Sequence, residues 1–229
     1  MKLFKEVDYE NSYSHIDGVK AIVMLVLLMA IQFSITLMSI WAINAYVITL
    51  CANAMYALCL MLVLFVFLGK EKANTIGITK HKLILSIVLG IVLGAILAVC
   101  RIVLGRIPGI PEYYVHSFRV VFLLQNLLII VTEEIAYRGF IGTRLCGFFK
   151  NHIVSSIITA VVFVLYFSLS KVPLMLHGFI PPYMGNMILM AALLHFLTDI
   201  TYKLTNNIWG AIVAHIIYYT AGILFLLQF

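Results

Sequence analysis

The sequence has few charged residues for its length. Of 229 residues, 10% are charged and 64% are apolar, and the mean hydropathy is +1.11. A soluble domain of this size cannot cover so much apolar surface with so few charges. The composition therefore excludes an ordinary soluble enzyme and predicts several membrane-spanning helices, with the lipid bilayer as the first partner of the chain.

The sequence also lacks paired cysteines and a concentrated basic face. Its four cysteines form no Cys-x-x-Cys pair, so neither a disulfide framework nor a thiolate metal site is indicated. The formal net charge of +6 comes from cations spread over short loops. In a membrane protein such cations report orientation, and we expect no nucleic-acid partner.

Long uncharged runs predict an all-α, polytopic transmembrane bundle of about seven spans, or eight if a proline-rich stretch after residue 170 holds another. Residues 1–20 are predicted to be a polar cytoplasmic segment, and residues 21–229 to form one integral membrane domain. The predicted spans are a hairpin over 21–69 that turns near Asn44, then 83–100, 120–137, 153–170, 186–202 and 208–227.

The distribution of cations predicts a cytoplasmic N-terminus. Eleven of the fifteen Lys and Arg residues fall on the side of the predicted bundle that carries the N-terminus. Positive charge is enriched in cytoplasmic loops. We expect an integral protein of a bacterial cell membrane with its N-terminus inside.

Several ionisable residues lie within or at the end of the apolar runs, where a charge costs roughly 2.5–3.5 kcal/mol on insertion scales. At ~1.5 Å per residue, three separate spans place these groups at ~6–12 Å from the same predicted boundary, so they could share one pocket. The residues are Glu133, Glu134, Arg138, His195, Asp199 and His215.

Helical spacing predicts different roles for the two glutamates. Glu134 and Arg138 are four residues apart and can form an ion pair on one helix face. Glu133 points about 100° away from that face. The pattern predicts that Glu134 has a structural role and that Glu133 is left for proton transfer.

Two motifs resemble those of the CPBP family, the membrane-embedded CAAX proteases and bacteriocin-processing proteins that are also called the Abi family. The segment EEIAYRG at 133–139 resembles the E-E-x-x-x-R-G signature of that family. The segment YKLTNNIWGAIVAH at 202–215 resembles its Y-x-x-T-G-S-I-W-x-x-x-x-x-H stretch. The resemblance covers roughly residue 83 to the C-terminus.

The resemblance implies an intramembrane endopeptidase that acts on a peptide or membrane protein. In that family a glutamate activates water, and histidines complete the site as metal ligands or as oxyanion donors. By motif position, Glu133 would be the base, Glu134 and Arg138 its support, and His215 the last histidine.

Two motif positions depart from the family pattern. The F-x-x-x-H motif aligns with Phe163 to Phe167, so its histidine is replaced by Phe167, and the asparagine expected four residues after His215 is Tyr219. Phenylalanine can neither bind a metal nor donate a hydrogen bond. His195 and Asp199 occupy two positions at which the family has small glycines.

These departures leave several interpretations open. The site can be rebuilt with His195, Asp199 and Tyr219, and His215, His195 and Glu133 would then offer ligands for Zn²⁺. His195 and Asp199 can instead be a local pair that ties two helices together. Alternatively, hydrolysis is lost and the chain is a membrane scaffold, regulator or bacteriocin-immunity protein. Intramembrane carboxylates and histidines also occur in proton-coupled transporters.

Overall fold

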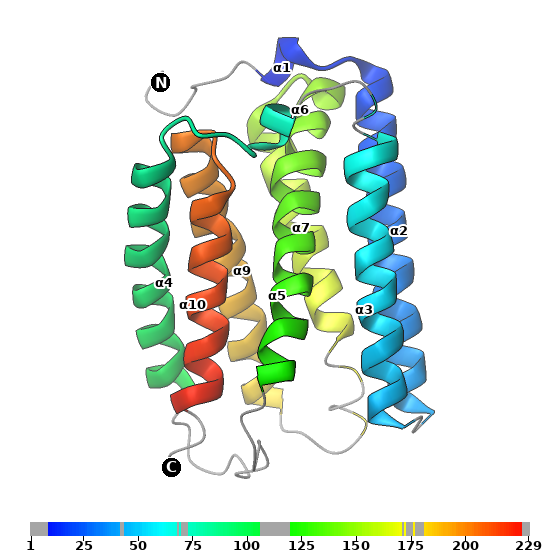
Figure 1. Cartoon of the computed structure of the whole chain (residues 1–229), viewed down its shortest axis with the longest axis vertical. Helices are drawn as coiled ribbons and strands as arrows, with labels where there is room; N and C mark the ends of the chain where they lie inside the picture. The colour runs from blue at the N-terminus through cyan, green and yellow to red at the C-terminus, as the bar shows by residue number, and fades with distance from the viewer. Residues whose placement is uncertain are drawn as a thin grey trace.

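The chain folds into a bundle of long helices in the computed structural model (Figure 1). The structure describes residues 9–41, 44–67, 69, 73–105, 120–170, 172, 176 and 181–225. All regular elements within these residues are helical, which confirms the predicted all-α class.

The helices follow the predicted apolar runs closely. Five of them are long and apolar enough to cross a membrane by length and composition, namely α2, α3, α4, α7 and α9. Helices α5 and α10 have 15 and 17 residues, so the count of seven spans stays a prediction. The elements are α1 (Tyr9–Ser12), α2 (His15–Ile40), α3 (Ala45–Met61), the π-helical η1 (Leu62–Phe67), the 3₁₀ turn η2 (Ala73–Ile76), α4 (Leu83–Gly105), α5 (Val120–Glu134), the π-helical η3 (Ile135–Gly142), α6 (Thr143–Phe149), α7 (His152–Leu169), α9 (Pro181–Thr205) and α10 (Trp209–Phe225).

The helices fall into two groups around a central helix (Figure 1). Helices α2 and α3 form an antiparallel hairpin on one side, and its turn lies next to Asn44, as predicted. On the other side α4 packs along α10, and both contact α9. Helices α5 and α7 run between these groups, so that side chains at the end of α5 meet residues from both sides.

Small residues let α4 and α10 approach closely. Gly90 faces Gly210, and Gly94 faces Ala214. The Ser86 hydroxyl reinforces the contact by donating to the Asn207 carbonyl oxygen at 3.1 Å. A side chain at Gly90 or Gly94 would meet the backbone of α10, so the four-residue spacing of these glycines permits the close packing.

The sequence predicted that the central span ends at residue 137, but the helix is longer. It continues through η3 and α6 to Phe149. Arg138 and Arg144, which lie beyond the predicted span, are both buried. Arg144 donates to the Gly139 carbonyl oxygen at 3.0 Å and stacks 4.6 Å from the Tyr13 ring centroid. The apolar pattern gave no sign that carbonyl groups and rings inside the bundle would satisfy these guanidinium groups.

The N-terminal segment is packed against the bundle in its described part. Ser14 and Asp17 form a capping box that starts α2 at His15, six residues before the predicted apolar run. The Tyr9 hydroxyl donates to Asn206 Oδ1 at 2.5 Å, and the Tyr13 hydroxyl donates to the Thr75 carbonyl oxygen at 3.1 Å. Tyr9 and Tyr13 thus anchor this segment to the bundle, whereas Asn11, Ser12 and Ser14 are exposed. Residues 1–8 lie outside the described part.

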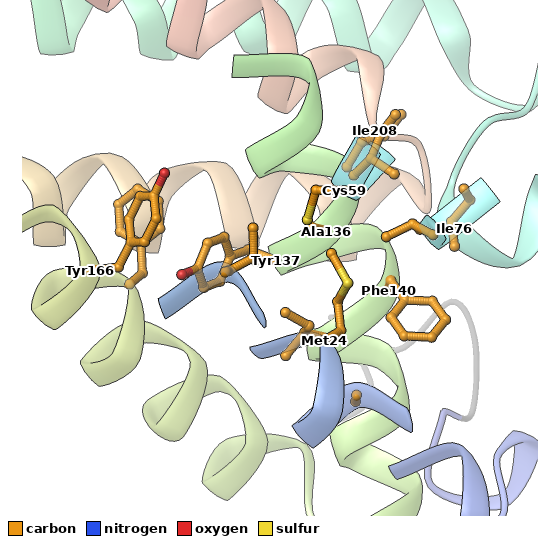
Figure 2. Close-up of a cluster of buried hydrophobic side chains, with 14 of the residues drawn as sticks. Met24, Cys59, Ile76, Ala136, Tyr137, Phe140, Tyr166 and Ile208 are labelled. Atoms are coloured by element: carbon orange, nitrogen blue, oxygen red, sulfur yellow. The ribbon is translucent and has the colours of Figure 1, made fainter. Parts of the chain in front are cut away.

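The largest group of buried apolar side chains surrounds η3. Figure 2 shows Met24 of α2, Cys59 of α3, Ile76 of η2 and Tyr166 of α7 gathered around this part of the central helix. Cys59 and Cys146 are buried and form no disulfide. The core thus holds in place the helix segment that follows directly after Glu134.

The orientation of the bundle stays a prediction. Many of the cations that carry the argument lie outside the described residues, among them Lys2, Lys5, Lys70, Lys72, Arg106, Arg119 and Lys171. Most of the proline-rich stretch at 171–180 lies outside them too.

Candidate active site

Two adjacent carboxylates at the end of α5 form the centre of the candidate site. Successive side chains on a helix differ in direction by about 100°, so Glu133 and Glu134 meet different partners. Glu134 is directed at residues of η3 and α10, and Glu133 at a residue of α7. The predicted difference between the two glutamates is therefore present in the structure.

Glu134 is held by two strong contacts. Arg138 Nη1 donates to its Oε2 at 2.6 Å, and both side chains are fully buried. His215 Nδ1 lies 2.7 Å from its Oε1. Because a carboxylate paired with arginine is ionised and can only accept, Nδ1 of His215 carries the hydrogen. Glu134 thus orients the imidazole, as a carboxylate does for a histidine in many active sites.

Glu133 has more freedom than its neighbour. Its Oε1 accepts from the Tyr166 hydroxyl at 2.7 Å, and no other described residue donates a hydrogen bond to it. It keeps 8% of its surface exposed, whereas Glu134 keeps none. His215 and Tyr219 are both close enough to interact with it electrostatically. Glu133 is the carboxylate that retains an oxygen for a further partner.

His195 reaches the cluster through Arg138. Nη2 of Arg138 lies 3.2 Å from Nδ1 of His195 and 3.3 Å from its carbonyl oxygen. Since arginine has no acceptor, Nδ1 of His195 accepts and its Nε2 carries the hydrogen. That buried Nε2 has no hydrogen-bond partner among the described residues. His195 is therefore a support for Arg138 in this arrangement.

Asp199 does not join the cluster. It pairs with Lys203 at 2.7 Å, and about a fifth of each side chain remains exposed. The Lys203 amine also contacts the Ser156 hydroxyl on α7. The predicted pairing of His195 with Asp199 is replaced by two separate contacts, because each side chain has a cationic partner of its own. Asp199 and Lys203 tie α9 to α7 outside the site.

Aromatic rings line one side of the cluster. Phe163 is buried, its ring centroid lies 4.8 Å from that of His195, and it also packs against the Arg138 guanidinium. Phe167 packs against the edge of the apolar core. Both positions of the degenerate motif therefore contribute packing. Tyr219 interacts electrostatically with Glu133, and its hydroxyl makes no hydrogen bond to a described residue.

The geometry does not fit the zinc ligands suggested by the sequence. No group of three or more His, Cys, Asp or Glu side chains able to hold a metal occurs within the described ranges. In this arrangement the Nδ1 lone pair of His195 is directed at the Arg138 guanidinium, and Nε2 would have to lose its hydrogen before it could bind a metal. A zinc site made of His215, His195 and Glu133 stays a prediction, and no step below depends on it.

Tyr166 is the site residue that sequence reasoning missed. Its neighbours at 163 and 167 belong to the motif, and the tyrosine between them was not considered. Tyr56 of α3 bonds to the same hydroxyl and in turn lies 3.3 Å from Gln32 Oε1 on α2. The available signal was a set of polar side chains inside apolar runs, since such groups persist where they find partners.

Part of the chain matches a known protein family. Residues 115–221 match the family model described as Type II CAAX prenyl endopeptidase Rce1-like. The matched segment contains every residue of the candidate site described above, from Glu133 to Tyr219. No curated protein and no solved structure gives a significant match to the chain.

Proposed function

This chain belongs to the CPBP family of CAAX-protease-related membrane proteins, and we propose that it is an intramembrane endopeptidase in which Glu133 activates a water molecule. The observation that carries the proposal is the unequal bonding of two adjacent carboxylates. Glu134 is fully buried and bonded to Arg138 and His215, whereas Glu133 has one hydrogen bond and an exposed edge.

The chemistry follows from these contacts. Oε2 of Glu133 takes a proton from water, and the oxygen of that water attacks the carbonyl carbon of the peptide bond. The C–N bond then breaks, and Glu133 passes its proton to the departing amine. No covalent enzyme intermediate forms, so a water-derived oxygen ends in the new carboxylate.

Two further side chains have roles in this scheme. With Nδ1 bonded to Glu134, Nε2 of His215 is an acceptor and can hold the second hydrogen of the attacking water. The Tyr219 hydroxyl is a donor without a described partner and lies in electrostatic range of Glu133. It is suited to stabilise the negative charge that develops on the carbonyl oxygen.

The test is peptide cleavage by the purified protein in detergent micelles. The probes are an S-farnesylated peptide that ends in a CAAX sequence and a set of unmodified membrane-protein tail peptides, with products identified by mass spectrometry. We expect cleavage by the wild type and a loss of at least about 100-fold in Glu133→Gln, because removal of a general base costs about 10²–10⁴-fold. Asp17→Asn, which changes an acidic residue at the start of α2, is the matched control and should cleave like the wild type.

A membrane scaffold without hydrolytic activity is the second candidate. It is favoured by Phe167, which places an apolar ring where the family motif has a histidine, and by the packing of Phe163 on His195. Under this alternative no peptide is cleaved, and Glu133→Gln leaves binding of a membrane partner unchanged. Cleavage that survives Glu133→Gln would refute the assigned base, even if the wild type proves active.

A further inference from the structure

A row of buried hydrogen-bonding side chains reaches Glu133 from the side opposite His215. Tyr166 on α7 donates to Glu133 Oε1 at 2.7 Å, and the Tyr56 hydroxyl on α3 bonds to the Tyr166 hydroxyl. Oε1 of Gln32 on α2 lies 3.3 Å beyond Tyr56. All three of these side chains are at most 5% exposed, so water does not compete for their hydrogen bonds.

The direction of these bonds follows from the number of hydrogens. Each tyrosine hydroxyl has one hydrogen, and a carboxylate has none to give. Tyr166 therefore uses its hydrogen for Glu133, and the single hydrogen of Tyr56 has two acceptors within reach, the Tyr166 oxygen and Gln32 Oε1. A hydroxyl that accepts a hydrogen bond becomes a better donor, since neighbouring bonds polarise one another.

We propose that Tyr166 is a positioning residue for Glu133, and that the contact with the Tyr56 hydroxyl holds the Tyr166 hydroxyl in place. This inference rests on the proposed function, because it assigns a task in the same reaction. The hydroxyl fixes Oε1 and leaves Oε2 as the oxygen that meets water. Carboxylate torsions have broad minima, so a carboxylate without this bond would not hold that orientation.

The surroundings of Tyr166 support a specific contact over general packing. Its ring lies against Tyr137 and Phe163, at centroid distances of 5.6 and 6.3 Å, and Figure 2 shows Tyr166 and Tyr137 side by side next to the apolar core. Tyr137 is equally buried, yet its hydroxyl has no hydrogen-bond partner among the described residues. The two tyrosines share an environment and differ in whether their hydroxyl contacts Glu133.

This difference supplies a matched pair of variants, Tyr166→Phe and Tyr137→Phe, each of which removes one oxygen atom. We expect Tyr166→Phe to lower kcat/KM by about 10- to 100-fold, since a hydrogen bond to a charged group is lost. In the pH–activity profile of this variant, the rise on the acidic side should move to higher pH, because the lost hydrogen bond favoured the charged form of the Glu133 carboxylate. Tyr137→Phe should stay within about twofold of wild type with an unchanged pH profile.

Tyr56→Phe gives a second test that leaves the Glu133 contact itself in place. We expect a smaller loss of about two- to fivefold and a smaller shift in the same direction, because only a contact that supports the Tyr166 hydroxyl is removed. This variant decides the matter if Tyr166→Phe fails to fold, which thermal unfolding in detergent will show. A Tyr56→Phe profile identical to wild type would then overturn the proposal.

The outcomes separate this inference from the proposed function. If the wild type cleaves, Glu133→Gln does not and Tyr166→Phe behaves like Tyr137→Phe, the inference is overturned and the endopeptidase assignment stands. A wild type that cleaves no probe overturns both. A loss of activity in Tyr166→Phe without a pH shift also counts against the proposal, because it indicates a packing role.

Discussion

Removal of Arg138 tests the buried centre of the site most directly. Arg138 and Glu134 form an ion pair at 2.6 Å with both side chains fully buried. Lys203 and Asp199 form an ion pair with the same four-residue spacing, at 2.7 Å, with side chains 22% and 18% exposed. The two pairs are alike in geometry and differ in burial, so the matched variants are Arg138→Met and Lys203→Met.

The two variants should lose different amounts of stability, because the first ion pair is buried and the second is partly exposed. Loss of one partner from a buried pair typically costs about 3–5 kcal/mol, since a charge is left without compensation. Arg138→Met also removes the donor to His195 Nδ1 and to the His195 carbonyl oxygen. For the partly exposed pair, solvent screens the interaction and the cost is about 1 kcal/mol or less. We therefore expect Arg138→Met to be the more destabilising variant by at least about 2 kcal/mol.

The measurement is equilibrium unfolding of both variants in mixed micelles, by titration of a denaturing detergent and detection by tryptophan fluorescence and circular dichroism. A second variant, Arg138→Met with Glu134→Gln, removes the charge that the first leaves unpaired. It should recover part of the lost stability. Equal destabilisation by Arg138→Met and Lys203→Met, or no recovery in the double variant, would refute the buried-charge reasoning.

Two further predictions concern how the site is held. Gly210→Ala should lower the free energy of unfolding by about 1–3 kcal/mol, because the added methyl group meets the backbone oxygen of Ser86 on α4. Gly185 has open space around it, so Gly185→Ala should leave the free energy of unfolding unchanged or raise it by up to about 1 kcal/mol. Equal thermal stability of the two alanine variants would contradict the close approach of α4 and α10. Asn207→Ala should lower the free energy of unfolding by about 2–3 kcal/mol, because the Asn207 amide donates to two carbonyl oxygens and its oxygen accepts from the Trp209 backbone N–H. Asn207→Asp keeps only the acceptor, so it should lose at least as much stability in the same thermal assay.

The difference in contacts between the two glutamates could be predicted from spacing alone. Glu134 and Arg138 lie four residues apart, and this local relation survives in the structure. The same rule failed for His195 and Asp199, because Asp199 also has Lys203 four residues further on. A lysine carries a permanent charge, and an acidic residue before a lysine is the better order for such a pair. Four-residue spacing offers Asp199 two partners, His195 and Lys203, and it pairs with the residue that carries the permanent charge.

The contacts between helices could not be predicted from spacing. Tyr166 meets Glu133 across 33 residues, and Tyr56 meets Tyr166 across 110. No periodic pattern links such positions, since it shows which face a residue occupies but not which helix covers that face. The buried arginines were misplaced for a related reason. A charge was interpreted as a membrane boundary, whereas the bundle contains carbonyl groups and rings that accept it.

The geometry of the site follows largely from Arg138. Its guanidinium keeps Glu134 ionised, and the ionised Glu134 fixes the tautomer of His215. The same guanidinium lies against Nδ1 of His195 and makes that nitrogen an acceptor. One motif residue thereby sets the state of three neighbours. This explains how the chain can carry phenylalanine in a second motif and still present a carboxylate and an oriented imidazole together, which are the two groups that water activation requires.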